Sequence, residues 1–133
     1  MVWEGRTQIF GCQDYIFGKQ LWKQLRVSDK VDVIITDCPL ILSALYDPKN
    51  REHFKANVFE TFNEFDNMNF FLNRVKPFNP NGRNEKTVEE AIANDNKLKD
   101  MLNENNIEYT IVDGNEEGCN KIFEAVLKKL NER

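Results

Sequence analysis

Polar side chains follow three short apolar runs of the chain. They are Asp37 after Val31–Thr36, Arg74 after Phe70–Leu72, and Asp113-Gly114 after Tyr109–Val112. Ligands of parallel α/β folds sit outside the carboxyl ends of the strands, so these positions are where chemistry is expected. Asp37 has a second interpretation, because an Asp shortly before Pro39 is also typical of the start of a helix.

The elements that must position these side chains can be predicted from the apolar spacing. The run from Val31 to Thr36 is rich in β-branched residues and apolar on both faces, which is typical of a strand covered on both sides and hence of a parallel sheet. Shorter strands are predicted at Phe70–Leu72 and Tyr109–Val112.

Helices are predicted between these strands. Their segments are Phe10–Leu25, Arg51–Asn67, the residues after Thr87, and about Asn115–Asn131. Thr87 and Glu90 form a capping box, and the last helix has acids in its first turn and lysines in its last turn. Alternation of strands and helices predicts an α/β fold, a three-layer sandwich with a mostly parallel sheet.

The segment from Lys76 to Lys86, KPFNPNGRNEK, contains two prolines, a glycine and three asparagines. Such a composition predicts an irregular loop, which is long enough to act as a flap over a site. We interpret residues 1–133 as one α/β domain with this flap at about 76–86.

Composition excludes several functional classes. Eighteen basic against 22 acidic residues give a net charge of -4, so general binding to nucleic acid is not expected. No apolar stretch is long enough to span a membrane and no signal peptide is visible, so we expect a cytoplasmic protein. Three widely spaced cysteines fit neither a disulfide framework nor a zinc site, and we expect buried or inert thiols. The only histidine, His53, is interpreted as an exposed helical residue.

Three longer segments carry a resemblance to a known family. They are IITDCPLILSALYDP from Ile34, FLNRVKPFNPNGR from Phe71, and EEAIANDNKLKDMLNENNIEYTIVDG from Glu89. Together they resemble the small P-loop kinase-like ATPases of phages and bacteria, which are relatives of nucleoside and nucleotide kinases. The resemblance implies ATP and Mg²⁺ as cofactors, Asp37 as the metal-binding and catalytic acid, and Arg74 and Arg83 as catalytic flap arginines. Arg74, Lys76 and Arg83 would bind the phosphates, because phosphoryl transfer depends on positioning and charge neutralisation. Alternatively, Arg83 is a solvated loop residue and Arg74 forms a surface ion pair.

The phosphate-binding loop of that family is missing from these residues. Its pattern, G-x-x-x-x-G-K-[ST], does not occur, and Gly18-Lys19 lies inside a predicted helix with Gln20 in place of the hydroxyl residue. We therefore expect a chain that is N-terminally incomplete, without the first strand and the loop. In the strand order of the resembled family, the missing first strand lies between Val31–Thr36 and Phe70–Leu72. A second copy or a protein partner is therefore expected at this vacated position. No cofactor is expected for the isolated chain.

Three functions stay open from the sequence. The chain is a degenerate, catalytically inactive kinase-like protein, or a phage-encoded interaction or inhibitor protein that reuses the scaffold, or part of an active ATP-dependent phosphotransferase.

Overall fold

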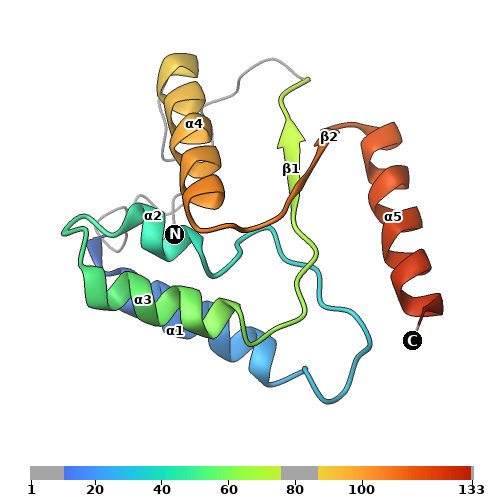
Figure 1. Ribbon diagram of the computed structural model, residues 1–133, viewed down its shortest axis with the longest axis horizontal. Coiled ribbons are helices and arrows are strands. Elements are labelled where there is room, and N and C mark those ends of the chain that lie inside the picture. The colour runs from blue at the N-terminus through green and yellow to red at the C-terminus, as the bar shows by residue number, and fades with distance from the viewer. Residues whose placement is uncertain (1–10, 76–86, 133) are drawn as a thin grey trace.

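The computed structural model describes residues 11–75 and 87–132, which form five helices and two strands. They are α1 (Gln13–Leu25), α2 (Leu42–Tyr46), α3 (Glu52–Phe62), β1 (Phe70–Asn73), α4 (Val88–Glu104), β2 (Thr110–Asp113) and α5 (Glu116–Asn131) (Figure 1). The predicted helices are present, although α1 and α3 are shorter than the apolar spacing suggested.

Two of the three predicted strands pair as expected. β1 and β2 are parallel, with Phe70 opposite Thr110 and Asn73 opposite Asp113. The backbone N–H of Thr110 donates to the carbonyl of Asn69 at 2.9 Å, and that of Gly114 donates to the carbonyl of Asn73 at 3.0 Å. The prediction of a parallel arrangement is confirmed for these strands.

The structure corrects the prediction of a strand at Val31–Thr36. Residues Val31–Thr36 have neither helical nor strand structure, and their backbone forms no hydrogen bond with the backbone of another described residue. Strand propensity alone does not make a strand, because a strand also needs a partner for its N–H and C=O groups. The sheet of the described residues therefore has two strands in place of the three predicted.

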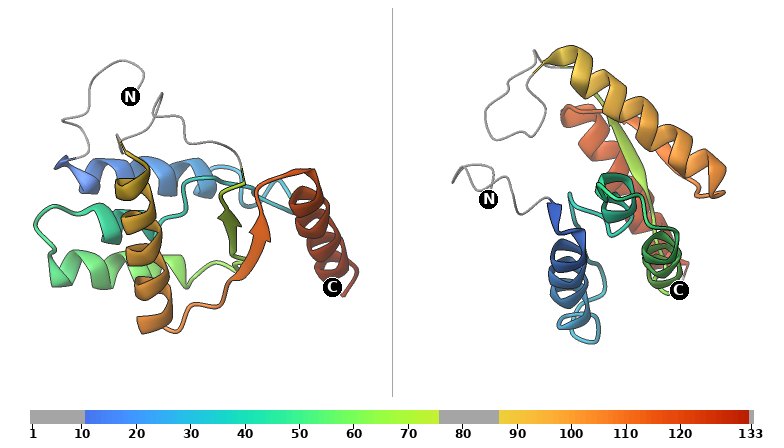
Figure 2. Two further views of the ribbon diagram at one scale, coloured as in Figure 1. Left: turned by 90° about the horizontal axis from the view of Figure 1, so that it is seen from above. Right: turned by 90° about the vertical axis from the view of Figure 1, so that its left-hand side faces the viewer.

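Side chains cap the two helices that flank the sheet. Thr87 caps α4, since its hydroxyl accepts a hydrogen bond from the backbone N–H of Glu90 at 3.1 Å, as the capping box predicted. Asn115 caps α5 by accepting from the N–H of Gly118 at 2.9 Å. Figures 1 and 2 show α4 and α5 on opposite sides of the two strands, so the two capped helices flank the sheet.

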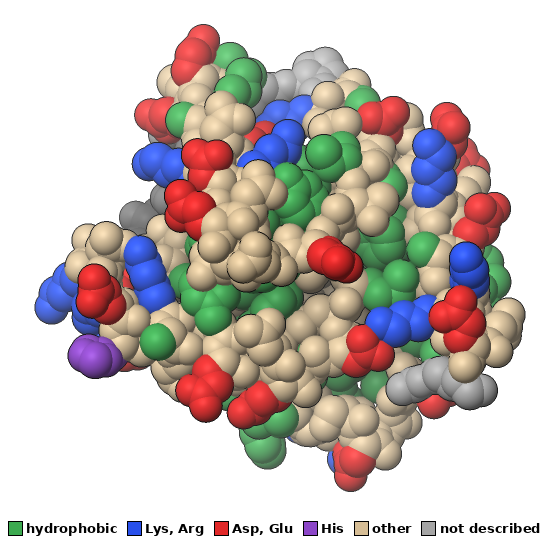
Figure 3. All heavy atoms as spheres, in the orientation of Figure 1, with side chains coloured by type: hydrophobic (Ala, Val, Ile, Leu, Met, Phe, Trp, Pro, Cys, Tyr) green, Lys and Arg blue, Asp and Glu red, His purple; other side chains and the backbone are tan. Residues whose placement is uncertain are grey.

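The main core lies among the helices rather than on the sheet. Its buried apolar residues come from α1, the turn before α2, α2, α3 and α4, and they are Phe17, Leu40, Ile41, Ala44, Phe54, Val58, Phe62 and Leu102. The rings of Phe17 and Phe54 meet edge to face with centroids 5.9 Å apart. By contrast, Leu72 on β1 and Ile111 on β2 are about half exposed, at 55% and 48%. Figure 3 shows apolar side chains reaching the surface between α4 and α5, so the sheet is only partly covered on this side.

An ion-pair cluster joins α1 to the start of α3. The guanidinium of Arg51 lies 2.5 Å from the carboxylate of Asp14 and 3.1 Å from that of Asp47, and it also stacks over the ring of Phe54. The Asp47 side chain is 2% exposed. The N–H of Arg51 and then its guanidinium lower the pKa of the Asp47 carboxyl, while hydrogen bonds from Arg51 lower that of Asp14. The cluster therefore links α1 to the start of α3 through two ion pairs, of which only the one to Asp47 has a buried carboxylate.

Within the described residues, no helix is both long enough and apolar enough to cross a membrane.

Candidate functional site

A tight turn presents Asp37 to solvent. The hydroxyl of Thr36 accepts a hydrogen bond from the backbone N–H of Cys38 at 3.0 Å, which fixes the backbone on either side of Asp37. The Asp37 side chain is exposed and forms no hydrogen bond or ion pair with another described residue. It does not cap a helix, because α2 begins only at Leu42 and the residue before it, Ile41, makes no side-chain cap.

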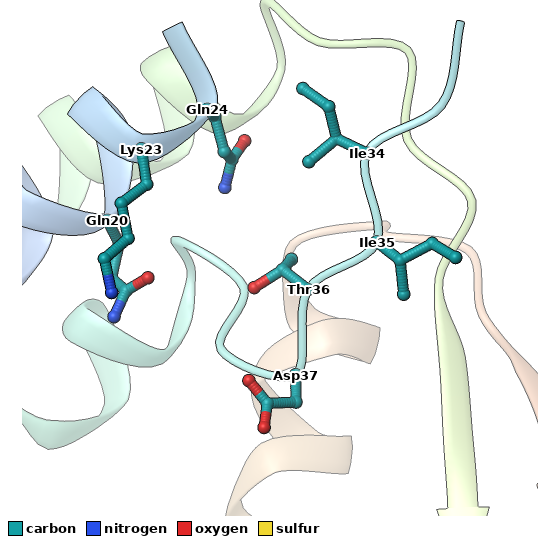
Figure 4. A pocket seen from close by; sticks show the side chains of 7 residues that line it. All are labelled: Gln20, Lys23, Gln24, Ile34, Ile35, Thr36 and Asp37. Carbon is teal, nitrogen blue, oxygen red and sulfur yellow. The ribbon is translucent and has the colours of Figure 1, made fainter. Parts of the chain in front are cut away.

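A groove lies between α1 and the segment that leads to Asp37. Its volume is about 450 Å³, and it is lined by Gln20, Lys23, Gln24, Ile34, Ile35, Thr36 and Asp37. Figure 4 shows the side chains of Ile34 and Thr36 on the α1 side of the segment and that of Ile35 on the other side. This alternation is the side-chain geometry of a strand. The groove therefore combines an ammonium, two amides, a hydroxyl and a carboxylate on an apolar wall.

Cys38 beside this groove is a weak nucleophile. Partial burial, and then the negative charge of Asp37, raise the pKa of its thiol, while Lys23 opposes them. Cys12 and Cys119 are free and exposed, so of the two expected alternatives, buried or inert, these two cysteines are not buried. His53 is exposed on α3, as predicted.

Arg74, which follows the carboxyl end of β1, forms an ion pair with α4. Its guanidinium makes a two-pronged ion pair with Asp95 of α4, with nitrogen–oxygen distances of 2.9 and 3.1 Å. Asp95 is thus paired with Arg74, as expected for the alternative in which Arg74 forms a surface ion pair. Lys76 and Arg83, together with the predicted flap at 76–86, lie outside the described residues.

The ends of the two strands are also linked. The Asn73 side chain donates to the carboxylate of Asp113 at 3.4 Å. Of the three predicted strand-end positions, Arg74 and Asp113-Gly114 are held by the paired strands. Asp37 is held by the separate turn after Val31–Thr36.

Comparison with protein families identifies the chain, because residues 3–118 match the AAA_28 family, an AAA domain. The chain belongs to this AAA domain family. Such domains are P-loop NTPases, which bind nucleotides and typically use ATP and Mg²⁺. The two parallel strands and their flanking helices agree with that fold class. No curated protein and no solved structure matches the chain.

The AAA domain offers magnesium only part of a coordination shell. Among residues 11–75 and 87–132 there is no group of three or more His, Cys, Asp or Glu that could hold a metal ion. Mg²⁺ in nucleotide sites is commonly bound by one or two carboxylates, with the remaining ligands supplied by phosphates and water. The exposed carboxylate of Asp37 fits that role, so this donor set suits a magnesium ion that arrives with a nucleotide and does not make a site by itself.

Several groove residues of the AAA domain were not predicted. Gln20, Lys23 and Gln24 come from α1, which was interpreted only as an amphipathic helix. Their spacing of three and one places them on one polar helix face, and that was the only signal in the sequence. The Asp47–Arg51 pair was also missed, although an acid four residues before an arginine is a recognisable pattern.

Proposed function

We propose that this chain is a P-loop NTPase-like domain that offers Asp37 to the magnesium ion of a bound nucleotide but does not catalyse phosphoryl transfer by itself. The observation that carries the proposal is the Asp37 carboxylate, exposed, unpaired among the described residues, and held on a defined turn in a groove that also contains Lys23. A carboxylate without a protein counter-charge is available to a cation, and a nearby ammonium attracts phosphate oxygens.

The proposed lack of catalysis rests on missing phosphate ligands. The 133 residues contain no G-x-x-x-x-G-K-[ST] pattern, so they supply neither the amide cradle nor the lysine that a P-loop brings to the transferred group. Gly18-Lys19 does not replace it, because both residues lie within α1. We expect Mg²⁺-ATP to bind more weakly than millimolar, which corresponds to less than about 4 kcal/mol.

Arg74 has a conditional role in this proposal. Its guanidinium is already satisfied by Asp95, so it would contact a phosphate only by exchanging one anion for another. Lys76 and Arg83 are proposed as further phosphate ligands on the sequence alone. The three-layer sandwich is proposed for a state in which Val31–Thr36 also joins a sheet.

The test uses Mn²⁺, which substitutes for Mg²⁺ and broadens NMR signals near its binding site. Adding Mn²⁺-ATP to the isotope-labelled chain should broaden the amides of residues 36–38 first, and Asp37→Asn should abolish that selectivity. Asp100→Asn, an exposed acid on α4, is the matched control and should leave the broadening unchanged. If the amides of residues 36–38 were still broadened first in Asp37→Asn, the assignment of Asp37 as a metal ligand would be overturned. Phosphate release above the blank, lost in Asp37→Asn, would overturn the proposed inactivity.

A further inference from the structure

The segment Val31–Thr36 has the properties of a strand that lacks a partner. Five of its six residues are β-branched, and its apolar side chains are exposed: Val31 by 47%, Val33 by 39%, Ile34 by 37% and Ile35 by 89%. In its second half, the side chains of Ile34 and Thr36 lie on one face and that of Ile35 lies on the other (Figure 4). Its backbone groups are not bonded to the backbone of any described residue. An exposed apolar strand of this kind is a template for pairing with another chain.

The charges of the segment indicate a second copy of the chain as the partner. In an antiparallel pair of identical strands about a two-fold axis, opposite residues point to the same face. The axis therefore runs midway between the two copies of one residue, which lie opposite each other. An axis at Asp32 places the two Asp32 carboxylates opposite each other. An axis at Val33 places Asp29 opposite Asp37. Like charges directly opposite are destabilising, so both registers are disfavoured.

An axis at Ile34 removes these conflicts. It places Ile34 opposite Ile34, Val33 opposite Ile35, and Asp32 opposite Thr36, where a hydroxyl can donate to a carboxylate. An axis at Ile35 instead places Asp32 opposite Cys38, so Asp32 has no opposite hydroxyl. The register centred on Ile34 is therefore the one in which the segment is complementary to itself.

We propose that two copies of the chain associate through antiparallel pairing of Val31–Thr36, centred on Ile34. This pairing supplies partners for the backbone groups of the segment and covers β-branched side chains with β-branched side chains. It is independent of nucleotide, since it places Asp37 opposite Val31 and uses no phosphate ligand.

The first experiment is sedimentation equilibrium of the full chain over a range of concentrations. We expect a monomer–dimer equilibrium that Ile35→Lys weakens about tenfold, because the two-fold axis introduces the change twice. Ile35 is 89% exposed, so its replacement should not unfold the chain. The matched control is Phe123→Lys on α5, where the ring is 62% exposed, and it should leave the equilibrium unchanged. A monomer at every concentration, association only with a different polypeptide, or equal effects of the two variants would overturn the proposal.

A disulfide test reads the register directly. In a chain with its three cysteines changed to serine, Ile34→Cys should form a covalent dimer under mild oxidation, because the two β-carbons face each other across the axis. Val33→Cys alone should not, since its opposite residue is Ile35, whereas a mixture of the Val33→Cys and Ile35→Cys chains should. Equal cross-linking of Ile34→Cys and Val33→Cys alone would refute the register.

Discussion

Gly118 in the first turn of α5 is expected to tolerate no side chain. A β-carbon added there would lie 1.7 Å from the carbonyl oxygen of Asp113 and 2.9 Å from its carbonyl carbon, and both are backbone atoms at the end of β2. Restoring an acceptable separation of 3.0 Å requires a shift of about 1.3 Å between α5 and β2. That shift also disturbs the cap from Asn115, whose side chain accepts from the N–H of Gly118.

Gly118→Ala should therefore destabilise the chain. Overpacking costs about 1 to 3 kcal/mol and loss of an N-cap about 1 kcal/mol, while Ala in place of Gly in a helix returns about 1 kcal/mol. We expect a net loss of about 2 kcal/mol in the free energy of unfolding, measured by urea denaturation with circular dichroism.

Gly18→Ala is the matched control, because Gly18 also lies in a helix and a β-carbon there meets nothing within 4 Å. It should stabilise the chain by about 0.8 kcal/mol through helix propensity alone. If Gly118→Ala were as stable as Gly18→Ala, the close approach of α5 to the end of β2 would be wrong.

Three further outcomes are expected. Phe62→Ala empties a core position that is 4% exposed and should cost about 3 to 5 kcal/mol in urea denaturation; a loss below 1 kcal/mol would contradict its burial. Asp47 has a pKa below its usual 3.8, so its stabilising effect is present above that pH and is lost as the pH falls toward the folded-state pKa. Acid titration followed by circular dichroism should therefore show a smaller loss of stability below 3.8 in Asp47→Asn than in the parent, and parallel titration curves would contradict the role of Arg51. Asp95→Asn removes the carboxylate that pairs with Arg74 and should strengthen Mg²⁺-ATP binding in NMR titrations, and a second change, Arg74→Gln, should cancel the gain. Unchanged nucleotide binding in Asp95→Asn would exclude Arg74 as a phosphate ligand.

Local patterns in the sequence predicted most of the secondary structure correctly. The helix that begins after Thr87 was recognised from its capping box, and the hydroxyl of Thr87 does accept from Glu90. The strands at Phe70 and Thr110 were recognised from short apolar runs, and their parallel pairing followed from the helix between them. These features depend on residues close in sequence, so a local pattern is sufficient to predict them.

The candidate site was predicted only in part. Asp37 was identified from its place after an apolar run, but its neighbours Gln20, Lys23 and Gln24 come from a helix that precedes it in the chain. Likewise, nothing near Arg74 in the sequence indicates that Asp95 holds it. Contacts between distant segments depend on how the helices pack, and apolar spacing does not specify which polar faces meet.

The sequence by itself determined where α4 and α5 begin, which runs can form strands, and that these residues carry no phosphate-binding loop. Only the tertiary structure decided that Val31–Thr36 has no sheet partner among the described residues, that Arg51 joins Asp14 to Asp47, and that Gly118 must lack a side chain. The physical reason is that capping and strand propensity act within a few residues, whereas strand pairing, ion pairs and close backbone approach require particular groups from distant segments to meet in space.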